Sequence, residues 1–421
     1  MHQKASPIMN SKDPGASSAG PHRLLPMWQV LVCGAAILIL SMGVRHGFGL
    51  WLQPITQARE WGREDFAFAL AIQNLAWGGF GIFVGMLADR FGAARLMAMG
   101  VVVYALGLLG MAWSASPLMF MLSTGVMMGL AQACTTFAIV FGVIGRNVPM
   151  EKRSWAMGVA AAAGSFGQFM MVPAEGLMIA NLGWDQALVV LAALMLLALP
   201  AVWFLREPGL TSGTAARRAQ TIGQALSEAF AYPPFLLLMA GYFVCGFQVV
   251  FIGVHMPSYL KDEGLSPQVA SYALALIGLF NIAGTYAAGS LGQRFPKTQI
   301  LAFIYYMRAV SIALFLYFPL SDTSVYLFSM GIGFLWLSTV PPTSATVAQI
   351  FGVAHLSMLG GFIFLSHQVG SFLGVWLGGY MYDRFGSYDL VWYLAIGLGL
   401  FAGTVNLLVR EAPIVRKVAH A

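Results

Sequence analysis

Ionisable side chains inside long apolar stretches are the residues of this sequence whose chemistry stands out. They are two arginines, two histidines and one glutamate, namely Arg45, His46, Glu175, Arg308 and His367. An ionisable group inside a hydrocarbon layer costs about 2.5–3.5 kcal/mol on insertion scales. Each of these residues is therefore a candidate for ligand binding or proton transfer.

The embedded cations outnumber the embedded acids. Arg45 and Arg308 stand against a single carboxylate, Glu175, before the two histidines are counted. A cavity with that balance prefers an anion, and a guanidinium offers a planar fork that matches a carboxylate. An exporter of cationic drugs would be expected to carry embedded Asp or Glu instead.

Every ionisable candidate also has a structural interpretation. Arg45 would extend to the outer headgroups, His46 would meet outer water, and Arg308 would cap backbone carbonyls or pair internally. His367 titrates near neutral pH and would relay a proton, or it makes a hydrogen bond between helices. Glu175 is a second candidate proton site, or it is solvated at the outer interface.

Two amides complete the candidate site. Asn281 and Gln368 also lie in apolar stretches. They would orient a bound anion, or they would join helices by hydrogen bonds.

Composition restricts the class of protein that can hold these residues. The chain has 421 residues, of which 59% are apolar and 9% charged, against about 25% charged in a typical globular protein. So little charge excludes a soluble fold, and the many aromatic residues exclude disorder. The apolar residues run in long stretches without alternation, which favours membrane helices over a membrane barrel. The three cysteines have no paired spacing, so we interpret them as small core residues.

Twelve stretches are long enough to cross a bilayer as helices, which takes about 20 residues each. The sequence therefore predicts an all-α membrane protein with spans at roughly 28–52, 66–87, 95–114, 117–144, 155–180, 186–205, 234–259, 268–290, 298–318, 323–349, 356–380 and 389–409.

The distribution of cations predicts the orientation. With both termini in the cytoplasm, 16 Lys and Arg lie on the cytoplasmic side and 4 on the outer side, with two inside helices, for a total of 22. Such an excess is typical of cytoplasmic loops. Short loops without an N-x-S/T site fit a multi-pass protein of a bacterial inner membrane.

The chain divides into two helical halves. We expect a disordered tail over 1–26, one six-helix bundle over 27–205, a cytoplasmic linker over 206–233, a second bundle over 234–410 and a tail over 411–421. Within the linker, apolar residues at the spacing i, i+4 and i+8 predict a short helix on the membrane surface, or else a flexible linker.

The two halves resemble each other. One set of residues recurs at an offset of 204 and another at an offset of 203: Gly85, Leu87, Arg90 and Phe91 as Gly289, Leu291, Arg294 and Phe295, and Gly158, Gly167, Gly176, Met178 and Gly183 as Gly361, Gly370, Gly379, Met381 and Gly386. A duplicated six-helix unit places a substrate site between the halves near the middle of the membrane.

Two further patterns predict helix packing. Gly370, Gly374 and Gly378 form a stripe of small residues suited to close helix contact. Pro341 and Pro342 interrupt the hydrogen-bond ladder of their span and predict a kink or hinge.

The stretch 85–95, Gly-Met-Leu-Ala-Asp-Arg-Phe-Gly-Ala-Ala-Arg, resembles the G-x-L-a-D-R-x-G-x-x-R signature of the major facilitator superfamily. The resemblance implies a conformational latch that closes the cytoplasmic side. In that latch, Gly85 allows close helix approach, Asp89 sits at a helix N-terminus of the other half, and Arg90 and Arg95 supply cations. The usual basic residues are missing at Ala93 and Ala94.

The first span resembles the monocarboxylate-porter and oxalate/formate-antiporter branch, because Gly-Phe-Gly-Leu-Trp at 47–51 follows a cation. The resemblance also implies that Asn281 and His367 occupy positions of polar substrate or proton groups. Relatives commonly carry an Arg where this chain has Thr285, so the usual carboxylate clamp is absent or is replaced by Arg45.

These observations predict a monomeric secondary transporter that moves a small organic anion, a monocarboxylate, with protons or by exchange, through alternating access. No P-loop, nucleophile triad or metal-ligand cluster is found, so we expect no enzyme activity and no cofactor. We expect lipid as its surroundings and no nucleic acid as a partner. The alternatives are a drug or xenobiotic exporter, and a non-transporting receptor on the same fold.

Overall fold

The computed structural model describes residues 25–206, 221–352 and 356–414, and within these ranges all regular structure is helical. The first half holds α1 (Met27–His46), α2 (Phe48–Arg59), α3 (Arg63–Phe91), α4 (Ala93–Trp113), α5 (Pro117–Phe120), the π-helical turn η1 (Met121–Met127), α6 (Met128–Thr135), α7 (Phe137–Asn147), α8 (Met150–Leu182), α9 (Trp184–Leu196) and α10 (Ala198–Phe204). The second half holds α11 (Ile222–Phe230), α12 (Pro233–Asp262), α13 (Pro267–Leu291), α14 (Lys297–Tyr317), α15 (Asp322–Leu335), α16 (Val340–Phe351), α17 (Leu356–Phe385) and α18 (Asp389–Leu407).

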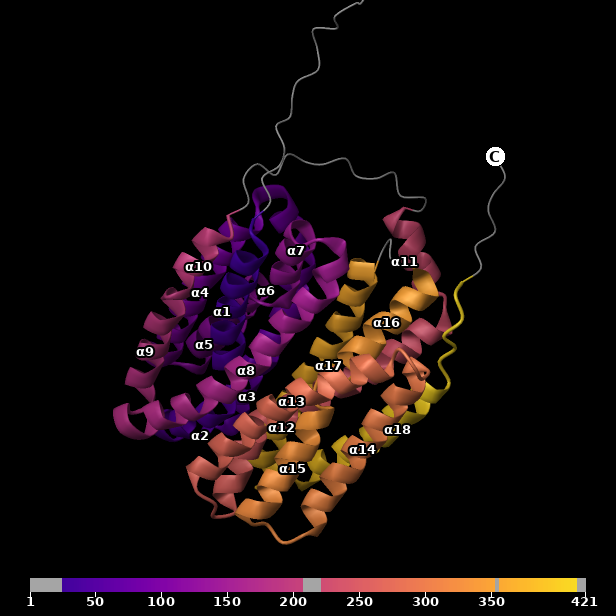
Figure 1. Cartoon of the computed structure of the whole chain (residues 1–421). Helices are drawn as coiled ribbons and strands as arrows, with labels where there is room; N and C mark the ends of the chain where they lie inside the picture. Colours follow the sequence, from indigo (N-terminus) through magenta and orange to yellow (C-terminus); the bar gives the residue numbers. More distant parts are fainter. Residues whose placement is uncertain (1–24, 207–220, 353–355, 415–421) are drawn as a thin grey trace, which may run out of the picture.

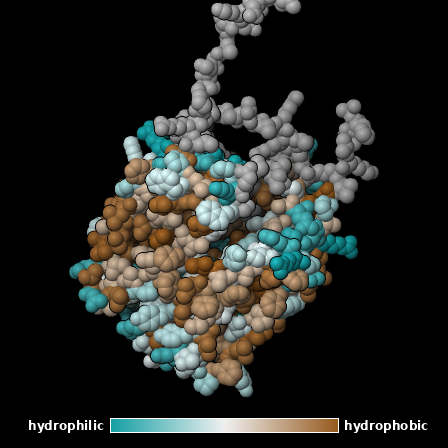
Figure 2. Space-filling view, in the orientation of Figure 1, coloured by the Kyte–Doolittle hydropathy of each residue, from teal (hydrophilic) through white to brown (hydrophobic). Residues whose placement is uncertain are grey.

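Twelve of the described segments are long and apolar enough to cross a membrane, which confirms the predicted number of spans. Large hydrophobic side chains such as Trp28, Trp203 and Tyr317 are exposed, and apolar residues cover much of the surface visible in Figure 2. Exposure of this kind is costly in water but not in lipid.

The helices gather in two groups that repeat one packing pattern. Figure 1 shows α1–α10 on one side and α12–α18 on the other. Within the first group α1 packs on α8 and α4 on α9, and within the second α12 packs on α17 and α14 on α18. These pairs join the first span to the fifth and the third to the sixth in each half, so the two halves are pseudo-symmetric.

Four spans are interrupted along their length. The first breaks at Gly47, between α1 and α2, the fourth at Thr136, between α6 and α7, the sixth at Leu197, between α9 and α10, and the tenth between α15 and α16. The break in the tenth span lies just before Pro341 and Pro342, where the sequence predicts a kink. In the linker, α11 confirms the predicted short helix, and Thr221 caps its N-terminus by accepting a hydrogen bond from the backbone N–H of Gln224.

The two ends of the molecule differ in how closely the halves meet. We call the end that carries Leu25 and Ile414 the tail end, and the opposite end the far end (Figure 1, top and bottom). At the far end α2 and α3 contact α12 and α17, and Arg63 forms an ion pair with Asp262 across the halves. Several glycines toward the tail end, including Gly361, have open space around them.

Glycine sets the approach of α17 to α12. A Cβ atom added at Gly370 would overlap the backbone carbonyl of Phe243, and one added at Gly374 would overlap that of Phe247. The predicted stripe of small residues therefore lies in a close helix contact, where backbones approach without side chains between them.

We expect Gly370→Ala to lower the free energy of unfolding by about 1–3 kcal/mol, because an added methyl group overpacks the interface. Thermal unfolding of the purified protein measures this. The matched control is Gly361→Ala on the same helix, where a Cβ meets nothing within 4 Å. Equal midpoints for the two variants would contradict the proposed packing role.

Candidate functional site

A small cavity lies between the two halves. Its volume of about 30 Å³ is far below the roughly 300–1,000 Å³ of ligand pockets, so binding a ligand here requires the halves to move apart. Helices α1, α2 and α3 line it from the first half, while α12 and the α15–α16 break line it from the second. The lining residues are Arg45, His46, Phe48, Gly49, Leu70, Gln73, Asn74, Val249, Val250, Gly253, Val254 and Trp336.

Arg45 supplies the positive charge of this cavity. It lies in the last turn of α1, which ends at Gly47, and a helix C-terminus favours a cation. Its Nη2 donates to the Asn74 side-chain oxygen at 2.7 Å, and its guanidinium carbon lies 4.6 Å from the centre of the Trp77 ring.

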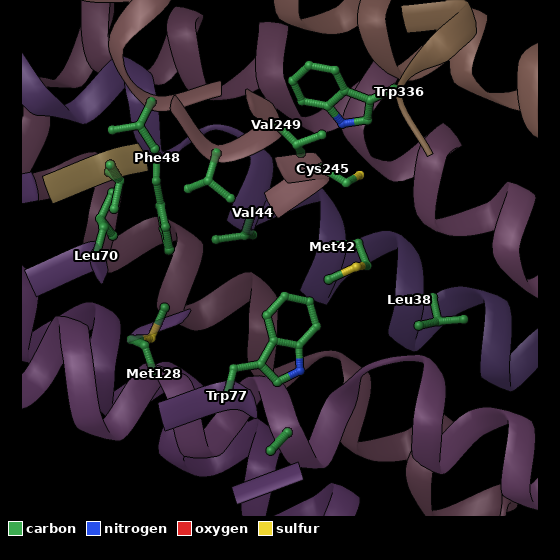
Figure 3. Close-up of a cluster of buried hydrophobic side chains, with 14 of the residues drawn as sticks. Leu38, Met42, Val44, Phe48, Leu70, Trp77, Met128, Cys245, Val249 and Trp336 are labelled. Carbon is green, nitrogen blue, oxygen red and sulfur yellow. The ribbon is translucent and has the colours of Figure 1, made fainter. Parts of the chain in front are cut away.

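The Arg45 guanidinium has donors to spare. Its buried Nε has no hydrogen-bond partner, and among the described residues no carboxylate forms an ion pair with it. Apolar side chains surround it, and Figure 3 shows Phe48, Trp77, Val249 and Trp336 gathered in one cluster. One unpaired cation among apolar walls suits a small anion with an apolar body.

His46 also lines the cavity. Its Nδ1 lies 2.6 Å from the Met42 carbonyl oxygen, four residues earlier in α1. This contact fits a protonated Nδ1, which leaves Nε2 as the free nitrogen of a neutral ring.

His367 and Gln368 do not line the cavity, but a chain of hydrogen bonds that passes through Asn74 connects them to Arg45. His367 Nδ1 lies 3.0 Å from the Gln368 side-chain oxygen, and Gln368 Nε2 donates to the Asn74 backbone oxygen at 3.1 Å. Since Asn74 also holds Arg45, a chain of contacts runs from α17 of the second half to the cation on α1.

Arg308 lies away from the cavity and is 1% exposed. Its Nη2 donates to the carbonyl oxygens of Leu335, at 2.7 Å, and of Trp336, and its Nε donates to Leu335 at 3.2 Å. These carbonyls belong to the break between α15 and α16, where the helix no longer supplies donors. The geometry matches the capping interpretation of Arg308 and not substrate contact.

Glu175 is fully buried on α8. Its Oε2 accepts a hydrogen bond from Trp51 Nε1 at 3.0 Å, while its Oε1 has no partner. The carboxyl group presses against Gly47, where any Cβ would overlap it. The structure therefore places Glu175 at the break of the first span, away from outer water, so the solvated interpretation is wrong.

Asn281 joins the halves. Its Nδ2 donates to Ser165 Oγ at 2.9 Å, and its Oδ1 accepts from the Leu337 backbone N–H at 2.9 Å. It lies outside the cavity lining, so its contacts are those of an interhelical amide.

The predicted latch is described only in part. Gly85 lies near the end of α3, with no atom within 4 Å of an added Cβ. Arg95 follows in the first turn of α4 and is exposed. The side chains of Asp89 and Arg90 lie outside the described residues.

The sequence prediction of the site did not include Asn74, which holds Arg45, or, apart from His46, the other residues that line the cavity with it. Gln73 and Asn74 are adjacent amides in the middle of an apolar span, which is itself a signal of a polar site. Trp336 and the valines of α12 gave no signal, because apolar residues in membrane helices are common.

The chain is similar to known proteins over most of its length. The family model described as Major Facilitator Superfamily matches residues 31–339. Monocarboxylate transporter 13 of Rattus norvegicus is 26% identical over 387 residues, covering 90% of this chain and 87% of the relative. The aspyridones efflux protein apdF of Emericella nidulans is 21% identical over 390 residues, covering 90% and 76%.

A solved structure shares the fold. A bacterial homologue of the human lysosomal transporter Spinster, in an inward-facing and unoccupied conformation, matches with a TM-score of 0.72 and 18% identity, over 91% of this chain and 96% of that chain.

We expect Arg308→Met to lower the free energy of unfolding by about 2 kcal/mol or more, because it leaves buried carbonyls without donors. Thermal unfolding in detergent measures the loss, and Arg308→Lys should recover part of it because an ammonium still donates. An Arg308→Met protein as stable as the wild type would contradict the capping role.

Proposed function

Because the chain belongs to the major facilitator superfamily, and is a membrane transporter rather than an enzyme, we propose that its cargo is a small organic anion, a monocarboxylate. Arg45 carries the proposal, since its guanidinium lies between the halves without an acidic partner in the part of the chain that the structure describes. Its free donors fit a carboxylate, and the valines and aromatic rings around it fit an apolar body. The similarity to a monocarboxylate transporter supports this choice.

The proposed orientation places the tail end in the cytoplasm of a bacterial inner membrane. It rests on the excess of Lys and Arg in the loops of that end. With the halves in contact at the far end, the cavity belongs to a state that is closed to the outside. We expect one chain to form the whole transport path.

Arg45→Gln should reduce uptake of the anion by roughly ten- to hundredfold, because a charge-assisted hydrogen bond contributes about 1.5–3 kcal/mol and 1.36 kcal/mol is tenfold. Uptake of labelled lactate, pyruvate and longer monocarboxylates into proteoliposomes measures this. The matched control is Lys261→Gln, an exposed cation at the far end.

Ligand-induced thermal stabilisation checks binding separately from uptake, since a ligand of one folded state raises its stability. Wild-type protein should be stabilised by monocarboxylates and Arg45→Gln should not. If both respond equally, Arg45 is not the carboxylate site.

His367 is the proposed proton-coupling group. An imidazole can bind and release a proton, and the contacts through Gln368 and Asn74 connect His367 to Arg45. A protonated His367 donates its Nδ1–H to the Gln368 side-chain oxygen, which strengthens that contact and so alters how Gln368 and Asn74 hold Arg45. Glu175, buried with an unpartnered Oε1, is the second candidate.

We expect His367→Gln to abolish accumulation driven by a proton gradient while exchange of labelled for unlabelled substrate persists. A variant that cannot bind the proton can still exchange its cargo. The parallel variant is Glu175→Gln. If that variant alone loses proton-driven uptake and keeps exchange, the coupling role passes from His367 to Glu175.

Export of apolar xenobiotics is the second candidate function. It is supported by the apolar lining of the cavity and by the similarity to an efflux protein. Resistance to a panel of toxic compounds on overexpression, unaffected by Arg45→Gln, would favour it over anion transport.

A further inference from the structure

The pattern G-x-x-x-D-R-F-G occurs twice in this chain, at 85–92 and at 379–386. Each copy ends a long helix, the first α3 and the second α17. In both, the helix ends on the Phe and the last Gly has a positive φ, 90° in the first copy and 68° in the second. The two copies therefore share local structure as well as sequence.

Helices α3 and α17 form an antiparallel pair across the two halves. The ring centres of Phe68 and Phe372 are 6.2 Å apart, and those of Trp77 and Phe364 are 5.1 Å apart. Since numbers rise along one helix as they fall along the other, the D-R-F-G end of each helix lies at the level where the other begins.

The far-end copy is engaged. Asp383 of α17 accepts hydrogen bonds from the backbone N–H groups of Arg63, at 3.0 Å, and of Glu64, at 2.7 Å. These are the first two residues of α3, whose N–H groups have no partner within the helix and carry its positive dipole end. The N-cap residue is Gly62, which has no side-chain oxygen to do this itself.

Gly62 also makes room for Asp383. A Cβ at Gly62 would lie against the Asp383 carboxylate. The N–H groups of Arg63 and Glu64 are thus capped by a carboxylate from the other half, while Asp65 of α3 itself accepts from the Gly62 N–H at 3.2 Å.

Arg63 adds a second link between the halves at the same place. Its guanidinium donates to both Asp262 carboxylate oxygens, at 2.6 and 2.8 Å, and to the Tyr388 hydroxyl at 2.7 Å. It also lies over the Tyr382 ring, 3.5 Å from its centre. The far end is held by an anion at a helix end and by this ion pair.

Toward the tail end, the glycines of α3 and α17 have fewer neighbours. Gly78 of α3 still meets the Gln368 side chain, whereas Gly85 of α3 and Gly361 of α17 have no atom within 4 Å of an added Cβ. Among the described residues, the contacts between the two helices thus reach from the far end to Trp77 and Gly78, and the glycines nearer the tail end face open space.

We propose that Asp383 is a second conformational latch, reciprocal to the one implied at Asp89, and that the two latches hold alternate ends of the α3–α17 pair. The register of the two helices supports this proposal. Asp383 of α17 caps the N-terminus of α3, which begins at Arg63. If the tail end closes in the same register, position 89 of α3 comes to the N-terminus of α17, which begins at Leu356. The proposal rests on the proposed alternating access.

When the two halves of the protein rock about the middle of the α3–α17 pair, this pair closes at one end as it opens at the other. Engagement of Asp383 therefore favours the state open at the tail end, and its loss favours the state open at the far end. The free energy of one latch opposes that of the other, so the balance between them sets the populations of the two states.

The test measures both ends in the purified full-length protein without substrate, so its result does not depend on the cargo. Spin-label pairs are placed at Glu60 and Glu263 for the far end and at Lys152 and Ala231 for the tail end, all exposed positions. The three native cysteines, all buried, are replaced by Ala or Ser. Pulsed dipolar spectroscopy then gives the fraction of molecules open at each end.

We expect Asp383→Asn to raise the ratio of far-end-open to tail-end-open molecules by about tenfold, because two charge-assisted hydrogen bonds to a helix N-terminus are lost. Asp383→Ser, whose single hydroxyl is shorter and carries no charge, should shift it at least as much. Asp89→Asn should shift the ratio in the opposite direction.

Arg384→Gln is the matched control, because Arg384 belongs to the same motif but is exposed beside Tyr380, and it should leave the ratio unchanged. Asp262→Asn weakens the Arg63 ion pair and provides a background with a measurable far-end-open population. If Asp383→Asn and Asp383→Ser fail to increase that population in the Asp262→Asn background, the proposed latch is wrong.

Discussion

Backbone groups inside a membrane have no water to bond with, and this constraint decides where the buried charges of this transporter lie. Four spans break along their length, among them the first at Gly47 and the tenth between α15 and α16. At these two breaks a helix C-terminus presents carbonyls, and an arginine lies beside it. Arg45 stands in the last turn of α1, and Arg308 donates to the carbonyls at the end of α15.

Both arginines lie beside a helix C-terminus, but they differ in how many of their hydrogen-bond donors have partners. Arg308 uses its donors on fixed carbonyls and on Gln248, so it belongs to the scaffold. Arg45 is held by one amide and one ring and keeps donors free toward the cavity. A charge that is positioned but not neutralised is what an anion site needs, because the protein supplies the geometry and the ligand supplies the missing charge.

The fold could be predicted from the sequence because span length and loop charge are properties of composition. The twelve spans and the break near Pro341 follow from such local patterns. The site could be predicted only in part. Arg45 stands out by its cost in a membrane, but Asn74, which orients it, and Arg308, which leaves the site, depend on which helix faces which. Helix rotation is set by long-range packing such as the glycine contacts of α12 and α17, and no single segment encodes it.

The contact between Gly47 and Glu175 has an evolutionary consequence. The carboxyl group of Glu175 fills the space that a side chain at position 47 would need, while Trp51 holds it there. A natural variant with any larger residue at 47 must shorten residue 175, and a variant that loses the acid leaves a void beside the helix break. Positions 47 and 175 should therefore change together in descendants of this chain, although 128 residues separate them in the sequence.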